Sequence, residues 1–172
     1  LMSYPSLVNC SSWFVLRALK LKLPIKKIIK STVYKMFCAG EDIHECRTVV
    51  NHLKKNNIIP CLHFSVEGDT RSQSKTEFIF DQTIKTIKFQ ASFKSKTFNV
   101  IKLSGIISPS FLQQWQESSS QKSKKLQLLW EESADKLSVL CETTDRFHSS
   151  IMIDAEESWI QDAIDDMSLY LA

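Results

Sequence analysis

Three charged residues stand where apolar, β-branched segments of the sequence end. Glu67 follows residues 58–66, Lys102 lies late in residues 98–103, and Asp154 closes residues 149–153. Leaving a charged side chain unpaired within an apolar segment costs free energy, so such positions usually have a partner or a function. In parallel α/β folds, reactive residues lie at the carboxyl ends of the strands. A lysine and two carboxylates are therefore the candidates for holding charge and protons in a shared pocket.

Each candidate also has a structural interpretation. An aspartate at a strand end commonly caps the next helix, and Glu156 and Glu157 in a first helical turn would suit the helix dipole. Glu67 alone would be a solvated loop residue. Lys102 has no such alternative, since a lysine inside a strand seldom has a structural role. His63 lies among apolar neighbours, where a hydrogen-bonded core histidine is the common outcome.

Hydrophobic periodicity predicts the elements that position these residues. Two basic helices broken at Pro24 and a third helix come first, and then three strands alternate with three helices. The predicted helices span residues 11–23, 25–37, 42–55, 78–91, 124–147 and 156–171. The predicted strands span residues 58–66, 98–103 and 149–153. Polar loops are predicted over residues 67–75 and 116–125. This order predicts a parallel α/β sheet with right-handed crossovers, and both a doubly wound sheet and a (βα)8 barrel fit it.

Composition narrows the class of protein. The 172 residues carry a net charge of +3, which is too small to indicate a nucleic-acid partner, and they are too few for a complete barrel of ~250 residues. Five cysteines without a CxxC pair favour a reducing compartment. Three glycines leave no glycine-rich phosphate cradle. No apolar segment approaches the ~20 residues that span a bilayer.

The charge of the chain is unevenly distributed. Residues 1–40 hold seven Lys or Arg and no acid, whereas residues 147–172 hold six Asp or Glu and no Lys or Arg. The basic opening helices have three interpretations: a solvated face, adhesion to an anionic membrane surface, or binding to nucleic acid. Nucleic-acid binding is the least favoured, because their aromatic residues form no stacking platform.

Three segments together resemble proline dehydrogenase in order and spacing. They are FCAGEDIHECRTVVNHLKKNNIIPCLHFSVEG, FNVIKLSG and MIDAEESWIQDAID, of which IDAEESWIQDAID is the most specific. The resemblance runs from about residue 12 to the end. It implies a helical segment over residues 1–41 and, over residues 42–172, an incomplete α/β (βα)8 TIM-like barrel with about three of the eight βα units.

The resemblance also implies a chemistry. The family holds FAD non-covalently, oxidises L-proline to Δ1-pyrroline-5-carboxylate and passes electrons to a membrane quinone. Lys102 matches the catalytic lysine that faces flavin and substrate, Asp154 matches the catalytic aspartate beside it, and Glu67 matches the glutamate that gates the proline site. His63 stands where the family segment LDYSVE has an acid, so it falls in the same substrate-binding or gating region.

Hydride removal from the carbon beside proline's nitrogen needs an unprotonated amine, and a reduced flavin gains negative charge that a nearby cation stabilises. The resemblance places such an enzyme at the inner-membrane periphery of a bacterium or in a mitochondrion.

Other family features have no counterpart in the sequence. The lysine-glycine-alanine-tyrosine segment that contacts flavin and the paired arginines that clamp proline's carboxylate are both absent, and both ends of the chain are expected to be truncated. We therefore expect these 172 residues alone neither to retain FAD nor to oxidise proline. The alternative, favoured by His63 and by the ends, is a non-catalytic remnant or binding fragment of a degraded or split proline dehydrogenase gene.

Overall fold

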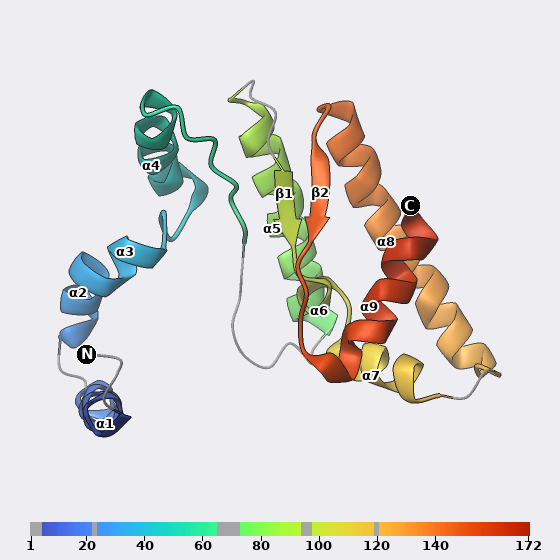
Figure 1. Cartoon of the computed structure of the whole chain (residues 1–172), viewed down its shortest axis with the longest axis horizontal. Helices are drawn as coiled ribbons and strands as arrows, with labels where there is room; N and C mark the ends of the chain where they lie inside the picture. Colours follow the sequence, from blue (N-terminus) through green and yellow to red (C-terminus); the bar gives the residue numbers. More distant parts are fainter. Residues whose placement is uncertain (1–4, 22–23, 65–72, 94–97, 119–120) are drawn as a thin grey trace. The chain divides into compact units, whose positions relative to one another are not determined.

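The computed structural model describes residues 5–21, 24–64, 73–93, 98–118 and 121–172. The chain forms two compact units, Leu1–Lys55 and Asn56–Ala172. The fold is mixed α/β, mostly helical, with a small parallel sheet in the second unit (Figure 1). The domain boundary expected after residue 41 stays a prediction.

The first unit consists of helices. They are α1 (Pro5–Lys20), α2 (Ile25–Ile29), the π-helical η1 (Lys30–Tyr34), α3 (Lys35–Phe37) and α4 (Ile43–Lys55). Helix α2 begins directly after Pro24, as predicted. The helix expected over residues 25–37 changes to π geometry at its centre. There the hydroxyls of Ser31 and Thr32 both donate to the carbonyl of Ile28, at 3.0 and 2.7 Å, and such bonds compete with the regular backbone ladder.

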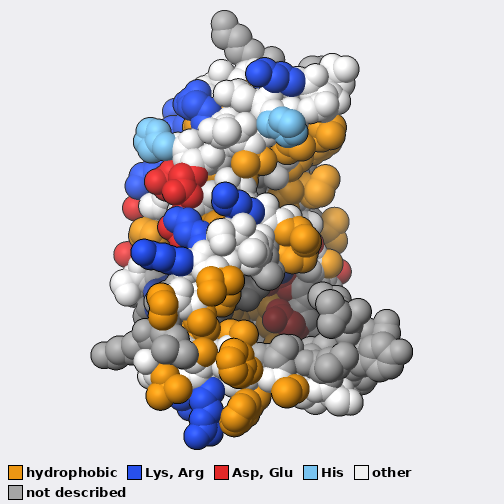
Figure 2. Space-filling view, turned by 90° about the vertical axis from the view of Figure 1, so that its left-hand side faces the viewer, with side chains coloured by type: hydrophobic (Ala, Val, Ile, Leu, Met, Phe, Trp, Pro, Cys, Tyr) orange, Lys and Arg blue, Asp and Glu red, His pale blue; other side chains and the backbone are white. Residues whose placement is uncertain are grey.

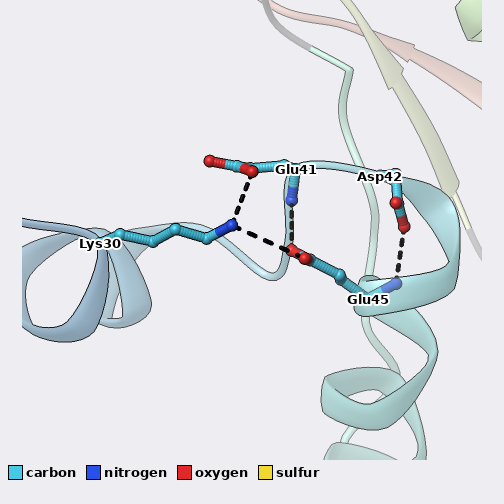
Figure 3. Close-up of polar contacts among 4 residues, drawn as sticks. All are labelled: Lys30, Glu41, Asp42 and Glu45. Atoms are coloured by element: carbon cyan, nitrogen blue, oxygen red, sulfur yellow. Dashed lines mark hydrogen bonds and ion pairs between the residues drawn. The ribbon is translucent and has the colours of Figure 1, made fainter. Parts of the chain in front are cut away.

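The start of helix α4 is fixed by side chains of the first helical turn and of the residues that precede it (Figure 3). The Asp42 carboxylate accepts from the backbone N–H of Glu45 at 2.8 Å, and the Glu45 carboxylate accepts from the backbone N–H of Glu41 at 3.0 Å. Lys30 pairs with Glu41 at 2.6 Å, and this hydrogen bond raises the pKa of the lysine. Gly40 has no room for a side chain, since an added Cβ would lie 2.5 Å from the Cβ of Glu45. The Asp42 carboxylate thus satisfies one of the backbone N–H groups that a helix leaves unpaired at its start, and the Glu45 carboxylate ties the preceding residue to the helix.

The second unit contains α5 (Gln73–Ala91), β1 (Phe98–Ile101), α6 (Leu103–Ile106), α7 (Pro109–Glu117), α8 (Lys124–Arg146), β2 (Ser150–Ile153) and α9 (Ser158–Leu171). Strands β1 and β2 pair in parallel, with Phe98 opposite Ser150 and Ile101 opposite Ile153 (Figure 1). Helices α6, α7 and α8 make the crossover between the strands. Both strands and their parallel relation agree with the prediction from sequence.

The two faces of the sheet differ in exposure. Successive strand residues point to opposite faces, and the register places Ile101 beside Ile153 on one face and Val100 beside Met152 on the other. Ile101 is buried against the helices, whereas the side chains of Met152 and Phe98 on the other face are 48% and 51% exposed. The helices therefore cover one face of the sheet, and the other stays open over the described residues.

The first expected strand does not form over its described part. Residues 58–64 have no regular secondary structure, and the rest of that prediction lies outside the described residues. Pro60 has no backbone N–H to donate to a ladder, and the N–H of Leu62 donates instead to the Gln90 side chain at 2.7 Å. The described sheet thus has two strands, and a (βα)8 barrel stays a prediction.

The sequence prediction also missed α7. Its start is nevertheless typical of a helix, because Ser108 precedes Pro109 in the first helical turn. Residues 116 and 117, expected in a loop, form the end of this helix.

Candidate functional site

The pairing of the two strands brings Lys102 and Asp154 together. Both residues directly follow strand ends that are in register, and the N–H of Asp154 continues the ladder by donating to the Ile101 carbonyl at 2.9 Å. Lys102 keeps an extended backbone, with φ −105° and ψ 122°, so its side chain follows the alternation of β1 onto the open face. The Lys102 Nζ lies 3.7 Å from the Asp154 Oδ2. These side chains are 43% and 46% exposed, so the pair is accessible to a ligand.

A second carboxylate, from Glu156, is held beside this pair. Its Oε1 accepts from the backbone N–H of Ser104 at 3.0 Å, and its Oε2 accepts from the Ser104 hydroxyl. The backbone N–H of Glu156 donates to the Gln161 side chain at 3.0 Å. Glu156 thus caps the short helix after β1 and ties the end of β2 to it. Its carboxylate is occupied by these bonds and has a structural role.

The capping interpretation of Asp154 is wrong. Helix α9 begins at Ser158, and the residue at its N-cap position is Glu157, whose side chain makes no capping hydrogen bond. Asp154 precedes that position by three residues, and its carboxylate faces Lys102. The structure therefore leaves this carboxylate for the ion pair.

The His63 side chain is partly buried, and the charges of Lys102, Asp154 and Glu156 act on it. Burial lowers the pKa of its imidazole, the positive charge of Lys102 lowers it further, and Asp154 and Glu156 oppose the shift. A neutral imidazole therefore stands near the ion pair at neutral pH, at the position where the family segment has a carboxylate. His63, Lys102 and Asp154 form what we call the strand-end cluster.

Glu67 lies outside the described residues, so its predicted role as a gate stays a prediction. Among the residues that are described, no group of His, Cys, Asp and Glu could hold a metal ion.

Sequence reasoning missed the polar residues that support the cluster. Ser104 binds Glu156, and Gln90 and Asn99 are each 2% exposed and hydrogen-bonded to one another at 2.7 Å. The signal that could have found the last two is a polar residue within an apolar stripe, such as the Asn in FNVI, because a buried amide must have partners.

A separate cavity of about 150 Å³ lies on the helix-covered side of the sheet. Its lining is mostly apolar and comes from β1, β2, α8 and α9, including Ile101, Ile153 and Leu137. Because Ile101 and Ile153 point away from the open face, this cavity is distinct from the strand-end cluster, and it holds no charged side chain.

The described residues account for only one part of FAD. Lys102 and the apolar side chains of the open face, Val100 and Met152, suit one part of a flavin ring. The sequence has no glycine-rich loop for the pyrophosphate, and the described residues offer no other cradle for it. We therefore assign no flavin chemistry to these residues alone.

Comparison with known proteins gives one partial match. A stretch of 95 residues, 55% of this chain, is 30% identical to the mitochondrial proline dehydrogenase 1 of Dictyostelium discoideum. The chain is similar to a proline dehydrogenase. The match spans only 17% of that relative, so the chain corresponds to a small part of its length. No protein-family model and no solved structure matches the chain. The similarity to an oxidoreductase agrees with the resemblance in its coarse form.

Proposed function

We propose that the chain is part of an enzyme that oxidises L-proline with FAD, and that the strand-end cluster contacts the substrate. The observation that carries the proposal is the Lys102–Asp154 pair, 3.7 Å apart at the carboxyl ends of two paired parallel strands. Those ends are where parallel α/β folds bind substrates. The partial similarity to a proline dehydrogenase supplies the substrate class.

In this proposal the ion pair controls the charge of the bound amine. Proline's nitrogen is an ammonium ion in water, and it must lose a proton before hydride can leave the neighbouring carbon. A cation close to that nitrogen disfavours the ammonium form. Lys102 supplies the positive charge, and Asp154 orients it from one side, so the substrate is bound as the neutral amine.

In this proposal Glu67 and His63 are further residues of the substrate-binding site. Glu67 would gate access to the cluster, as the resemblance implies. His63 replaces a carboxylate with a neutral imidazole, which changes both charge and reach beside Lys102. We propose that this exchange weakens proline turnover relative to the family.

The remaining parts of the proposal concern the whole protein. They are a (βα)8 barrel that encloses FAD, electron transfer to a quinone, and a mitochondrial location, which is that of the Dictyostelium relative. We propose that the 172 residues alone neither retain FAD nor turn over proline, because the sequence has no glycine-rich segment for the pyrophosphate.

A chimaera tests this function. Residues 56–172 replace the corresponding segment of the Dictyostelium relative, and flavin absorbance confirms that the purified protein is loaded. We expect proline-dependent dye reduction that falls about 100-fold or more in Lys102→Met and in Asp154→Asn, the usual effect of removing a preorganised charge. Lys85→Met, which removes an exposed lysine of α5, is the matched control and should keep the activity.

The outcomes separate the proposal from its alternative. Full activity of a loaded Lys102→Met chimaera contradicts the proposed role of the pair. A loaded chimaera that is inactive even with His63→Asp supports the non-catalytic remnant instead. Turnover by the 172-residue chain alone would contradict the fragment interpretation.

A second function, contact with an anionic membrane surface, is favoured by α1. Trp13, Phe14 and Leu16 are each 59–64% exposed, and Arg17 and Lys20 lie in the last turn of the same helix. Figure 2 shows hydrophobic and basic side chains side by side on one face of the molecule. No described helix is long and apolar enough to cross a membrane. Exposed aromatic residues beside lysine and arginine suit the interface of an anionic bilayer.

Vesicle co-sedimentation tests this contact. We expect binding to vesicles that contain phosphatidylserine, little binding to phosphatidylcholine alone, and loss of binding at high salt. Trp13→Ala with Phe14→Ala should reduce it, and binding that is equal on neutral vesicles would contradict the proposal.

A further inference from the structure

A continuous series of hydrogen bonds, buried at its centre and partly buried at its ends, begins next to His63. The backbone N–H of Leu62 donates to the Gln90 Oε1 at 2.7 Å, and the Gln90 Nε2 donates to the Asn99 Oδ1 at 2.7 Å. The Asn99 Nδ2 donates in turn to the Ser149 Oγ at 2.9 Å. This amide relay joins the segment before α5, the end of α5, strand β1 and the turn before β2.

The direction of the amide relay has only one solution. A backbone N–H can only donate, so the oxygen of Gln90 must face Leu62 and its NH2 group must face Asn99. Asn99 must then present its oxygen to Gln90 and its NH2 group to Ser149. The Ser149 hydroxyl continues the series by donating to the Thr144 carbonyl at 3.3 Å. Each bond of the series pairs a donor with an acceptor in one orientation only, and such direction makes a polar network specific.

Burial makes these partners hard to replace. Gln90 and Asn99 are each 2% exposed, so water does not substitute for a lost partner. An apolar side chain of similar size would fill the same volume without holding Leu62. Stability alone therefore does not explain a glutamine at this position, whereas the fixing of Leu62 does.

We propose that Gln90 is a positioning residue for the strand-end cluster: through the N–H of Leu62 it holds the irregular segment 58–64 against β1 and so keeps His63 beside Lys102 and Asp154. Residues 58–64 have no strand ladder to fix them, and the Gln90 side chain takes over that role. The inference rests on the proposed function only in treating this cluster as the substrate site.

The test uses the 172-residue chain and needs no activity. Gln90→Met keeps the volume of the side chain but leaves Leu62 without its acceptor. Thr83→Val is the matched control, because Thr83 is also buried in α5 but its hydroxyl donates only to a carbonyl of its own helix, that of Ile79, at 2.8 Å. The titration of His63 is followed by NMR, with its resonance assigned from His63→Gln. The pKa of His63 starts below 6.5 because of burial and Lys102, and we expect it to move up toward 6.5 in Gln90→Met and to stay in Thr83→Val.

Amide exchange supplies a second measurement in the unmodified chain. The Leu62 amide should be protected, and Gln90→Met should speed its exchange at least about tenfold, which corresponds to about 1.4 kcal/mol. An unprotected Leu62 amide overturns the proposal even if the variant does not fold. A folded Gln90→Met chain with an unchanged His63 titration also overturns it. Both results are independent of proline oxidation, so failure of the proposed function would leave this test intact.

Discussion

Removing the Lys102–Asp154 ion pair should leave the stability of the fold nearly unchanged. At a separation of 3.7 Å, the Coulomb energy of two unit charges in water is about 1.1 kcal/mol. The side chains are 43% and 46% exposed, so the surroundings are close to water, and ordering the long lysine chain offsets part of the gain. We expect a coupling energy of about 0.2–1 kcal/mol, which is typical of exposed pairs.

A double-mutant cycle measures this coupling. The 172-residue chain, Lys102→Met, Asp154→Asn and the double variant are unfolded with urea, and the free energies of unfolding are compared. The pair between Arg146 and Glu142 is a suitable reference, because it is 3.5 Å apart and more exposed, at 75% and 67%. Its coupling should be about 0.3–0.5 kcal/mol, and both couplings should decrease at high salt.

A large coupling would refute the reasoning. If the Lys102–Asp154 value exceeded about 2 kcal/mol, the pair would behave as a desolvated structural pair. The argument that these charges are kept for a ligand would then lose its basis. A small coupling, together with loss of turnover in the chimaera, would separate function from stability at the same two residues.

Three further predictions concern other parts of the chain. The pKa of His63 is lowered by folding, so its contribution to stability is present above about pH 6.5 and is lost as the pH falls through the folded pKa. His63→Gln should remove this loss of stability at acid pH, which is measured by urea unfolding at about pH 7.5 and about pH 5. A pH dependence that is the same in the variant would contradict the prediction. Leu112→Ala, at a fully buried position, should cost about 2–5 kcal/mol of unfolding free energy, whereas Leu128→Ala, 60% exposed, should cost under about 0.5 kcal/mol, and similar costs would argue against the described core. Gly40→Ala should cost about 1–3 kcal/mol and lower the helix signal in circular dichroism, because its Cβ would meet the Cβ of Glu45 at 2.5 Å; an unperturbed spectrum and stability would refute the contact.

The sequence predicted those elements whose pattern is set by packing alone. The apolar spacing of residues 124–147 matches α8, which buries Leu137 and Leu140. Strands β1 and β2 lie within the predicted residues 98–103 and 149–153, because β-branched residues fit a parallel sheet. Position in the core, rather than local chemistry, determined these elements.

The elements that the prediction missed depend on single side chains. Residues 58–64 are as apolar as a strand, but Pro60 removes a donor and Gln90 captures the N–H of Leu62. Helix α7 was obscured by serine and glutamine, although Ser108 and Pro109 mark its start. Hydrophobic periodicity is an average over many residues, so it does not show which hydrogen-bond partner a single backbone N–H group has.

The candidate site was predictable in part for the same reason. Lys102 and Asp154 could be found because a charge within an apolar segment is conspicuous in the sequence. Ser104 could not, since neutral polar residues are common on surfaces and only the structure shows that it binds Glu156. Gln90 stands within an apolar stripe, but only the structure shows that its partner is the N–H of Leu62. Supporting residues are thus harder to predict than the charges they support.

The exposure of the ion pair also bears on how it could act on a substrate. In water the interaction of its charges is about 1 kcal/mol, but in a partly desolvated pocket with an effective dielectric constant of about 20 it would be about fourfold stronger. In the proposed function, Lys102 would influence the protonation of a bound amine by the same Coulomb interaction, so its effect would grow as water is excluded. The two described strands place the charges in register and leave their open face to solvent. Position is therefore encoded within this chain, whereas the strength of the effect depends on what covers that face, and a bound substrate is itself one such cover.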